Sequence, residues 1–280
     1  DGRSREPGLG VARPTRYRDA AAAPALARLA VPAVPVTLAV AVASAGTRRL
    51  TQLAAYGVKI ARRERAAERA RALEAVGRAG GLALQERWFL QELSERAPRI
   101  EGALIGPEDL AQVRPGIETP EAPAALGGAL AYRPAWADER SPREPPPAER
   151  HALAAVDARG NVAAALWHEC AGALPLFDGQ LALPAIATPV VSGVTRPKPG
   201  AAVPMPAPLA FLSHREGRVE AVFASNAAEL SAAMVEAVGA AGAGLWPAAD
   251  APSPYGDKIE LVAALASDAS GREGATRHWR

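Results

Sequence analysis

The chain has 280 residues, of which 49% are hydrophobic, and its 32 Lys and Arg nearly balance 30 Asp and Glu, for a formal charge of +2. A chain of this length and composition buries one large core or two smaller ones, so we expect a globular protein. No block of like charge forms a track for phosphates, so a nucleic-acid partner is not expected. The single cysteine, Cys170, excludes an internal disulfide and a cysteine-rich metal site.

Residues 1–29 are predicted to form an extended arm, because residues 1–24 are rich in Arg, Gly and Pro and show little periodicity. The apolar run over residues 29–45 follows several arginines and ends in small residues, as the core of a signal peptide does. Its two prolines and its internal position argue against that interpretation. It is also shorter than the roughly 20 residues that a membrane span takes. No membrane span is expected, and the location stays open between cytoplasm and periplasm.

Residues 30–140 are predicted to be mainly helical, with helices over residues 48–76 and 82–97 separated by Gly80 and Gly81. A short helix should begin near Pro107. The first helix has apolar residues at buried-face spacing: Leu50, Leu53, Ile60, Leu73 and Val76. The second has two i,i+4 apolar pairs: Leu84 with Trp88, and Phe89 with Leu93. Glutamates interleave with the arginines of residues 61–74, which indicates a solvated helix face rather than a nucleic-acid contact.

A Pro-rich linker over residues 141–150 precedes a β-rich part, residues 151–266, and a tail, residues 267–280. The β-rich part holds two predicted hairpins and a last strand. The first hairpin pairs residues 151–156 with 161–166, the second pairs 209–213 with 218–224, and the last strand covers 258–264. Asn226 should cap a helix over residues 227–239. The Pro-punctuated loop over residues 167–208 is where an active site would usually be built.

Several separated segments resemble the γ-glutamyltransferase family of N-terminal-nucleophile hydrolases, in order and in spacing. They are Val31-Pro32-Ala33, Gly46 to Leu53 with Ile60-Ala61, Glu108-Asp109-Leu110-Ala111 with Arg114-Pro115, Val156-Asp157 with Gly160-Asn161, and Pro199-Gly200 with Val203-Pro204-Met205 and Pro208. The resemblance covers roughly residues 30–240. It implies an α/β (α+β) fold of the αββα sandwich type, incomplete relative to the family.

The resemblance also implies where the chemistry should be. The family cleaves γ-glutamyl or related amide bonds with a Thr that self-cleavage frees at the start of a strand, and the α-amine of that Thr is its base. The corresponding position here is about Glu149 or Arg150. Neither residue can attack a carbonyl or undergo the N–O acyl shift. We therefore expect neither self-cleavage nor catalysis by this mechanism, and no cofactor.

The other family positions have changed as well. The residue that binds the glutamyl α-amine falls near Glu169, and the serine pair that binds the substrate carboxylate maps to Val203 and Pro204. The turn that supplies the oxyanion-hole amides maps to about Ser225 and Asn226. The N-terminal third of the family has no counterpart before residue 30. The resemblance therefore implies a fold that persists without its catalysis.

Three residues remain as pocket candidates: His151, His168 and Cys170. His168 and Cys170 lie two apart on an extended segment, so their side chains could share a face. A metal site is not expected, because neither CxxC nor HExxH occurs. Ser192 and Thr195 would be nucleophiles only with a base beside them.

The leading hypothesis is a catalytically degenerate γ-glutamyltransferase-like protein that acts as a structural or regulatory subunit, with another protein chain as partner. A sandwich that lacks one of its strands leaves an unpaired edge, which a partner, in a homo-oligomer or a hetero-oligomer, would cover. The first alternative is a divergent amide hydrolase or acyltransferase that uses a relocated Ser, Thr or Cys170. The second is a small-ligand-binding module that uses the old pocket.

Overall fold

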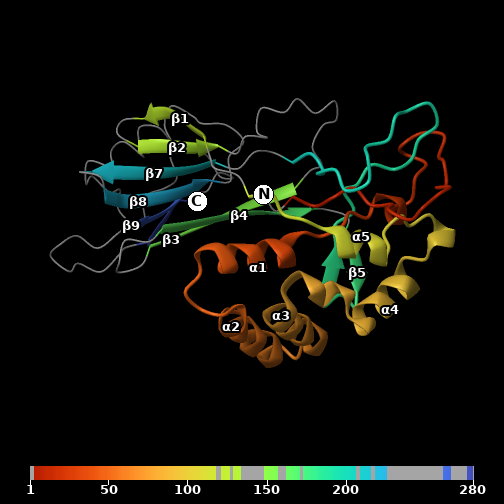
Figure 1. The fold of residues 1–280 in the computed structure, drawn as a ribbon, viewed down its shortest axis with the longest axis horizontal. Helices are drawn as coiled ribbons and strands as arrows, with labels where there is room; N and C mark the ends of the chain where they lie inside the picture. The colour runs from red at the N-terminus through yellow and green to blue at the C-terminus, as the bar shows by residue number, and fades with distance from the viewer. Residues whose placement is uncertain are drawn as a thin grey trace. The chain divides into compact units, whose positions relative to one another are not determined.

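The structure is a computed structural model, and it combines helices with antiparallel sheets in an α+β fold (Figure 1). It describes residues 3–117, 121–126, 129–133, 148–156, 162–170, 173–205, 209–215, 218–225, 261–265 and 276–279. The chain forms two compact units. The helical unit comprises residues 1–117 and 170–205, and the sheet unit comprises residues 118–169 and 206–280. The helical unit therefore takes in part of the segment predicted as β-rich.

The helical unit contains five α-helices and three 3-10 helices among its described residues. The α-helices are α1 (Val34–Ala45), α2 (Leu50–Arg63), α3 (Ala67–Ala79), α4 (Arg87–Arg96) and α5 (Pro107–Gln112). The 3-10 helices are η1 (Ala25–Arg28), η2 (Gly80–Gln85) and η3 (Arg99–Glu101). The predicted helix near Pro107 is confirmed as α5. α1 lies in the apolar run, inside the part predicted to be mainly helical, although no helix bounds were predicted for it. No helix in the described part of the chain is long and apolar enough to cross a membrane.

The helix predicted over residues 48–76 is instead two helices, α2 and α3, which pack against each other. Between them Arg65 has φ of 61°. The N–H of Arg65 bonds the carbonyl of Arg62 at 3.1 Å, and the N–H of Ala66 bonds that of Ala61 at 2.8 Å. These two bonds form a Schellman motif, which ends α2 and reverses the chain.

The predicted second helix, residues 82–97, is divided into η2 and α4 at Glu86. Gly80 and Gly81 do more than separate helices, because α1 packs closely on them. A Cβ atom at Gly81 would lie 2.2 Å from Cγ2 of Val36. Only glycine therefore permits this approach of α1 to η2.

The main core of the helical unit lies between α4, α5 and the chain segments that pack on them. Phe89 and Leu93 are 2% and 3% exposed, which confirms this predicted apolar pair. The predicted buried face of α2 is partly wrong. Leu53 is 47% exposed, and the buried residues of α2 are Val58 and Ala61. The glutamates of α2 and α3 form exposed ion pairs with the arginines, as expected of a solvated face. They are Glu74 with Arg62, Glu64 with Arg69 and Glu68 with Arg71.

The segment predicted as a long loop contains a small antiparallel hairpin, β5 (Leu174–Leu176) with β6 (Leu181–Leu183). This hairpin docks on the helices. The Phe177 ring lies 5.1 Å from the Trp88 ring, and the N–H of Phe177 donates to the Glu92 carboxylate at 2.6 Å. The Gln180 Oε1 accepts the N–H of Glu68 at 2.8 Å, so this side chain caps the N-terminus of α3 from a distant part of the chain.

The N-terminal arm was predicted to be extended over residues 1–29, whereas the 3-10 helix η1 lies within it and backbone bonds hold its first part in the helical unit. Arg5 and Val31 exchange two N–H to carbonyl bonds of 3.0 and 2.9 Å. On the other side the N–H of Glu6 bonds Ala201 at 2.8 Å. Glu6 is only 1% exposed, and its carboxylate accepts bonds from the backbone N–H and the hydroxyl of Thr188. Isolated β-bridges at Arg5 and Tyr17 therefore connect the arm to distant parts of the chain.

The sheet unit contains a six-stranded sheet with the order β1-β2-β7-β8-β9-β10. Its strands are β1 (Glu121–Leu126), β2 (Ala129–Arg133), β7 (Leu209–Arg215), β8 (Arg218–Ser225), β9 (Leu261–Leu265) and β10 (Thr276–Trp279). Every pairing in it is antiparallel. The second predicted hairpin is confirmed as β7 with β8, in which Phe211 pairs with Phe223.

A separate two-stranded sheet, β3 (Ala148–Val156) with β4 (Val162–Cys170), is the first predicted hairpin. The five residues between these strands are too few for a parallel crossover, so the pair is antiparallel. β3 also contacts β8 and β9 of the larger sheet. Both strands are longer than predicted, since β3 begins within the predicted linker and β4 runs into the predicted loop.

Strands β1, β2 and β10 were missed by the sequence analysis. β1 and β2 lie in the part predicted to be mainly helical, although the two apolar runs around Gly127 and Gly128 are a hairpin signal. Pro123 suits β1 because β1 is the edge of the sheet. β10 lies in the predicted tail and pairs with β9. The predicted helix over residues 227–239 and the predicted turn over residues 157–160 lie outside the described residues.

Candidate functional site

The nucleophile position that the resemblance implies falls inside a strand. β3 begins at Ala148, so Glu149 and Arg150 are part of it and belong to the two-stranded sheet with β4. Neither residue carries a hydroxyl or a thiol. The strand therefore offers no atom that could attack an amide carbonyl at this point.

The next residue on β3, His151, contacts two residues of β4. Its imidazole stacks on the Trp167 ring, with the centroids 5.2 Å apart and the planes inclined by 22°. Its Nε2 lies 3.5 Å from Oε2 of Glu169. The structure thus brings together two residues that the sequence analysis singled out, His151 and Glu169, and adds Trp167. We call these three residues the β3–β4 cluster.

The β3–β4 cluster lacks the parts of a catalytic dyad. The Glu169 side chain is 76% exposed, so its charge is well solvated and its attraction for an imidazolium is weak. The His151 Nε2 is buried and has no hydrogen-bond partner among the described residues. A general base needs a proton donor within hydrogen-bond reach, such as a hydroxyl or a thiol. The arrangement is a cross-strand aromatic contact with a loosely associated carboxylate.

Trp167 is the residue of this cluster that the sequence analysis missed. The predicted strand ended at residue 166, which left Trp167 in a loop, whereas β4 continues to Cys170. A β4 that continues beyond residue 166 lies across from the beginning of β3. This pairing is the signal that could have placed Trp167 in the strand. Aromatic side chains on facing strands commonly pack together.

His168 and Cys170 both lie within β4, so the segment that holds them is extended as expected. No group of three or more His, Cys, Asp or Glu that could hold a metal ion occurs in the part of the chain that the structure describes. This finding gives no metal-binding role to His168 or to Cys170.

Of the two positions implied for carboxylate binding, Val203 is part of a core and Pro204 is half-buried. Val203 is fully buried and packs with Ala30, Ile186 and Ala187. Its N–H donates to the carbonyl of Ser4 at 2.9 Å, and Pro204 has no N–H to offer. Neither residue therefore has a backbone donor available for a substrate carboxylate.

The implied oxyanion position is only partly described. Ser225 is the last residue of β8, and its backbone pairs with Leu209 on one side and Leu261 on the other. It therefore belongs to the body of the sheet, between two neighbouring strands, and not to an open turn. Asn226 lies outside the described residues.

The Glu-Asp-Leu motif has a structural role at Asp109. One carboxylate oxygen, Oδ2, accepts the N–H of Gly106 at 2.9 Å and so caps α5. The other, Oδ1, accepts the N–H groups of Gly8 and Leu9, both at 2.8 Å. The residue is 2% exposed. Burial raises the pKa of Asp109, and the three amide bonds oppose this increase.

Two further hydroxyl residues were considered as nucleophiles, Ser192 and Thr195, and both are exposed. Within the described ranges, neither hydroxyl has a carboxylate or an imidazole within hydrogen-bond distance. The one hydroxyl in the described residues that donates to a carboxylate is that of Thr188, at 2.7 Å from Glu6. That carboxylate is buried and also accepts the Thr188 N–H, so this contact fastens the arm.

Comparison with protein-family models, with curated proteins and with solved structures finds no significant match to this chain.

Proposed function

We propose that this chain is a catalytically degenerate relative of the γ-glutamyltransferases and acts as a structural or regulatory subunit of a larger assembly. The observation that carries the proposal is the position of Glu149 and Arg150 inside β3. A nucleophile of this class acts from the free N-terminus of a strand, whereas here the strand begins earlier and holds no hydroxyl at this point.

The proposed fold is the αββα sandwich. It is supported by the two hairpins β3–β4 and β7–β8, and by the contacts that β3 makes with β8 and β9. Two sheets in contact are the inner layers that such a sandwich requires. The order of these hairpins along the chain is the order that the resemblance implies.

The proposed loss of catalysis has support from a second position. The packing of Val203 and the bond of its N–H to Ser4 leave no donor where the family binds the substrate carboxylate. The two changes are of different kinds. The one at Glu149 and Arg150 removes the nucleophile, and the one at Val203 places a buried core residue where the family has a binding site. A shift of the alignment by one residue would not restore either, because the residues around both positions are Ala148, His151, Ala202 and Met205.

The proposed role as a subunit rests on apolar side chains that are exposed among the described residues. α1 is built almost entirely of apolar residues and has no buried residue. Val34 and Leu38, one turn apart on this helix, are 56% and 48% exposed. A partner chain would cover such surface.

The experiment is an assay of the pure full-length chain with a γ-glutamyl anilide, both with and without an acceptor dipeptide. We expect no turnover above that of the buffer. Turnover that disappears in one of Cys170→Ser, Ser192→Ala or Thr195→Ala would contradict the proposal and would support a divergent hydrolase with a relocated nucleophile. Each preparation is compared with a mock purification. Turnover equal to that of the mock would come from a contaminating enzyme, whereas turnover above the mock in all three variants would indicate another Ser or Thr as nucleophile and would also contradict the proposal.

A further inference from the structure

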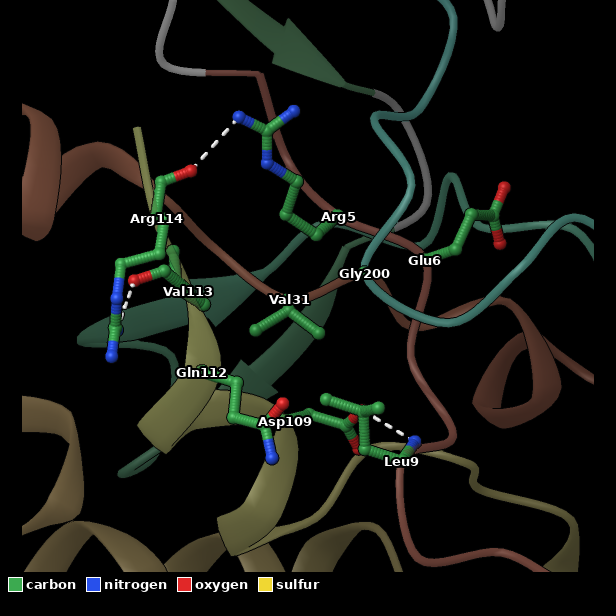
Figure 2. Close-up of a pocket in the computed structure, with 9 residues that line it drawn as sticks. All are labelled: Arg5, Glu6, Leu9, Val31, Asp109, Gln112, Val113, Arg114 and Gly200. Atoms are coloured by element: carbon green, nitrogen blue, oxygen red, sulfur yellow. Dashed lines mark hydrogen bonds between the residues drawn. The ribbon is translucent and has the colours of Figure 1, made fainter. Parts of the chain in front are cut away.

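The first part of the N-terminal arm is bound to the helical unit on both of its edges, as an extended peptide would be (Figure 2). On one edge, Val31 exchanges two backbone hydrogen bonds with Arg5. On the other edge, the segment 200–203 exchanges two bonds of 2.8 Å with Glu6. This pairing resembles the way in which a bound peptide adds a strand to its receptor.

Two side chains bind the arm at Glu6 and Pro7. The N–H and the hydroxyl of Thr188 both donate to the Glu6 carboxylate, at 2.9 and 2.7 Å. The Nη2 group of Arg196 donates to the carbonyl of Pro7. Glu6 is 1% exposed, so without its carboxylate the two Thr188 donors would lose a buried acceptor. The contact therefore selects an acidic residue.

A third side chain, Asp109, binds the two residues that follow. Its Oδ1 accepts the N–H groups of Gly8 and Leu9, both at 2.8 Å, and Figure 2 shows the bond from Leu9. Gly8 has φ of 105°, and a Cβ atom there would overlap the guanidinium of Arg196. This position therefore requires glycine. We call the residues that hold the arm the arm groove; they are Val31, Asp109, Thr188, Arg196 and residues 200–203.

Polar groups hold the arm in the arm groove, and the arm adds little to the apolar core. Along the described chain, the aliphatic and aromatic residues buried in the core begin at Ala23. Burial lowers the pKa of Arg196, which the charges of Glu6 and Asp109 oppose. The Arg196 Nε is a buried donor without a partner among the described residues. Desolvated charges stabilise a fold less than apolar packing often does, so the arm should open at a lower free energy than the core.

The arm also fits the arm groove incompletely. A cavity of about 250 Å³ lies beside the arm, and Leu9, Val31 and Val113 are among the residues that line it (Figure 2). Protein interiors contain few voids larger than a water molecule. Residues 10–16, which follow this part of the arm, form no backbone hydrogen bond to a distant segment within the described structure. They can therefore act as a hinge when the arm leaves.

We propose that the arm groove is a peptide-binding site that the chain's own arm closes, and that its ligand is an extended segment of a partner chain with the pattern Glu-Pro-Gly. A bound peptide replaces the arm at each bond, including the one that the N–H of Val203 donates to Ser4. The arm competes at the effective concentration that a short connection gives, on the order of millimolar. It therefore keeps the site closed to weak ligands.

This inference goes beyond the proposed function, because a hydrolase could carry the same arm groove. It does not require that catalysis is lost. The turnover assay and the peptide titration therefore succeed or fail separately.

The test is a titration of the full-length chain with a fluorescent peptide of the arm sequence, residues 3–10, followed by anisotropy. The variant Gly8→Val should open the site, because valine at φ of 105° is strained and overlaps Arg196. We expect the peptide to bind this variant saturably below about 1 mM, since the arm itself occupies the site at that effective concentration. The native chain should bind the peptide at least about tenfold more weakly, because its arm competes.

Two altered peptides of the same length test the recognition. The Glu6→Gln peptide should bind the opened chain about tenfold more weakly, as loss of a charged hydrogen bond predicts. The Gly8→Val peptide should not bind, because it overlaps Arg196 as the variant arm does. Equal affinity of the three peptides, or no saturable binding of the arm peptide to a folded Gly8→Val chain, would overturn the proposal.

Hydrogen exchange of the native chain tests the same claim without a variant that could disturb the fold. The N–H groups of Glu6 and Leu9 should exchange faster than that of Ala97, which is 4% exposed in the core. Several millimolar arm peptide should displace the arm, so Glu6 and Leu9 should exchange faster still while Val31 stays protected. The Gly8→Val peptide should change nothing. If Glu6 and Leu9 exchange at the rate of Ala97, with and without the peptide, the arm is a fixed part of the fold and the proposal is wrong.

Discussion

The imidazole of His151 on β3 stacks on the indole of Trp167 on β4, with ring centroids 5.2 Å apart. This contact occupies the residue that directly follows the position where the resembled family has its nucleophile. The imidazole of His151 is thus directed to a neighbouring strand and not to a reacting group.

The first prediction concerns this contact. The variants His151→Ala and Trp167→Ala and their combination form a double-mutant cycle, and we expect a coupling of about 0.5–1.5 kcal/mol in the free energy of unfolding, as for other aromatic pairs. His151→Phe should keep most of the stability, because it preserves the stacking and removes only the weak interaction with Glu169. Urea denaturation measures the native chain and the four variants, and additive single effects would contradict a direct contact.

The second prediction concerns the cap that Gln180 provides for α3. Gln180→Ala should lower the free energy of unfolding by about 1 kcal/mol, because the N–H of Glu68 loses its acceptor. Gln91→Ala is the matched control, since Gln91 is exposed on α4 and its side chain donates to Glu95 on the same exposed face at 3.1 Å. If both variants unfold at the same denaturant concentration, the hairpin β5–β6 does not cap α3.

The third prediction concerns Asp109 and pH. Asp109→Asn should lower the free energy of unfolding by about 1–3 kcal/mol, because an amide cannot accept all three N–H bonds. Burial raises the pKa of this carboxyl above its ordinary value of 3.8. The folded state therefore holds the proton more tightly than the unfolded state, and this contribution to stability is present below pH 3.8 and is lost as pH rises through the folded pKa.

The stability difference between the native chain and Asp109→Asn should consequently narrow as the pH is raised from below 3.8 toward neutrality. Glu95→Gln serves as the control, since Glu95 is exposed on α4 and accepts an exposed side-chain bond from Gln91 at 3.1 Å. If the stability difference between the native chain and Asp109→Asn widens as pH rises, the three backbone N–H bonds to Asp109 outweigh the effect of burial, and its pKa is lowered.

The sequence predicted those parts of the fold whose signals are local. The hairpins follow from runs of β-forming residues around short turns, and α5 follows from Pro107 at its start. The break between α2 and α3 could not be predicted in this way, because a Schellman motif usually has glycine at the position that Arg65 occupies with φ of 61°. Tertiary packing around Ala66, which is 9% exposed, favours this conformation over a continuous helix.

The sequence analysis named residues of the candidate site, but it did not predict which residues contact one another there. His151 and Glu169 were singled out separately, and their proximity depends on how far β4 extends beyond the predicted strand. The burial of Val203 depends on Ser4, about 200 residues away along the chain, and no local pattern indicates that pairing.

The fourth prediction is that the pure chain associates. If a partner chain covers the apolar surface of a degenerate subunit, sedimentation velocity at micromolar concentration should show a species larger than one chain, with an interface of at least about 1,000 Å². A dimer in which both copies use the same surface is the simplest closed arrangement. A stable monomer across the concentration range would contradict self-association and leave only an association with a different chain.

The central claim, that the chain lacks its nucleophile, is tested most directly by the intact mass of the purified protein under denaturing conditions. Denaturation is necessary because residues 170–205 are part of the same compact unit as residues 1–117, so two cleaved pieces would remain together under native conditions. We predict a single mass for the uncut chain, which should not change on prolonged incubation. Two masses that sum to the whole chain plus one water molecule, with a new N-terminus at residue 149, 150 or 151, would show self-cleavage and would contradict the claim.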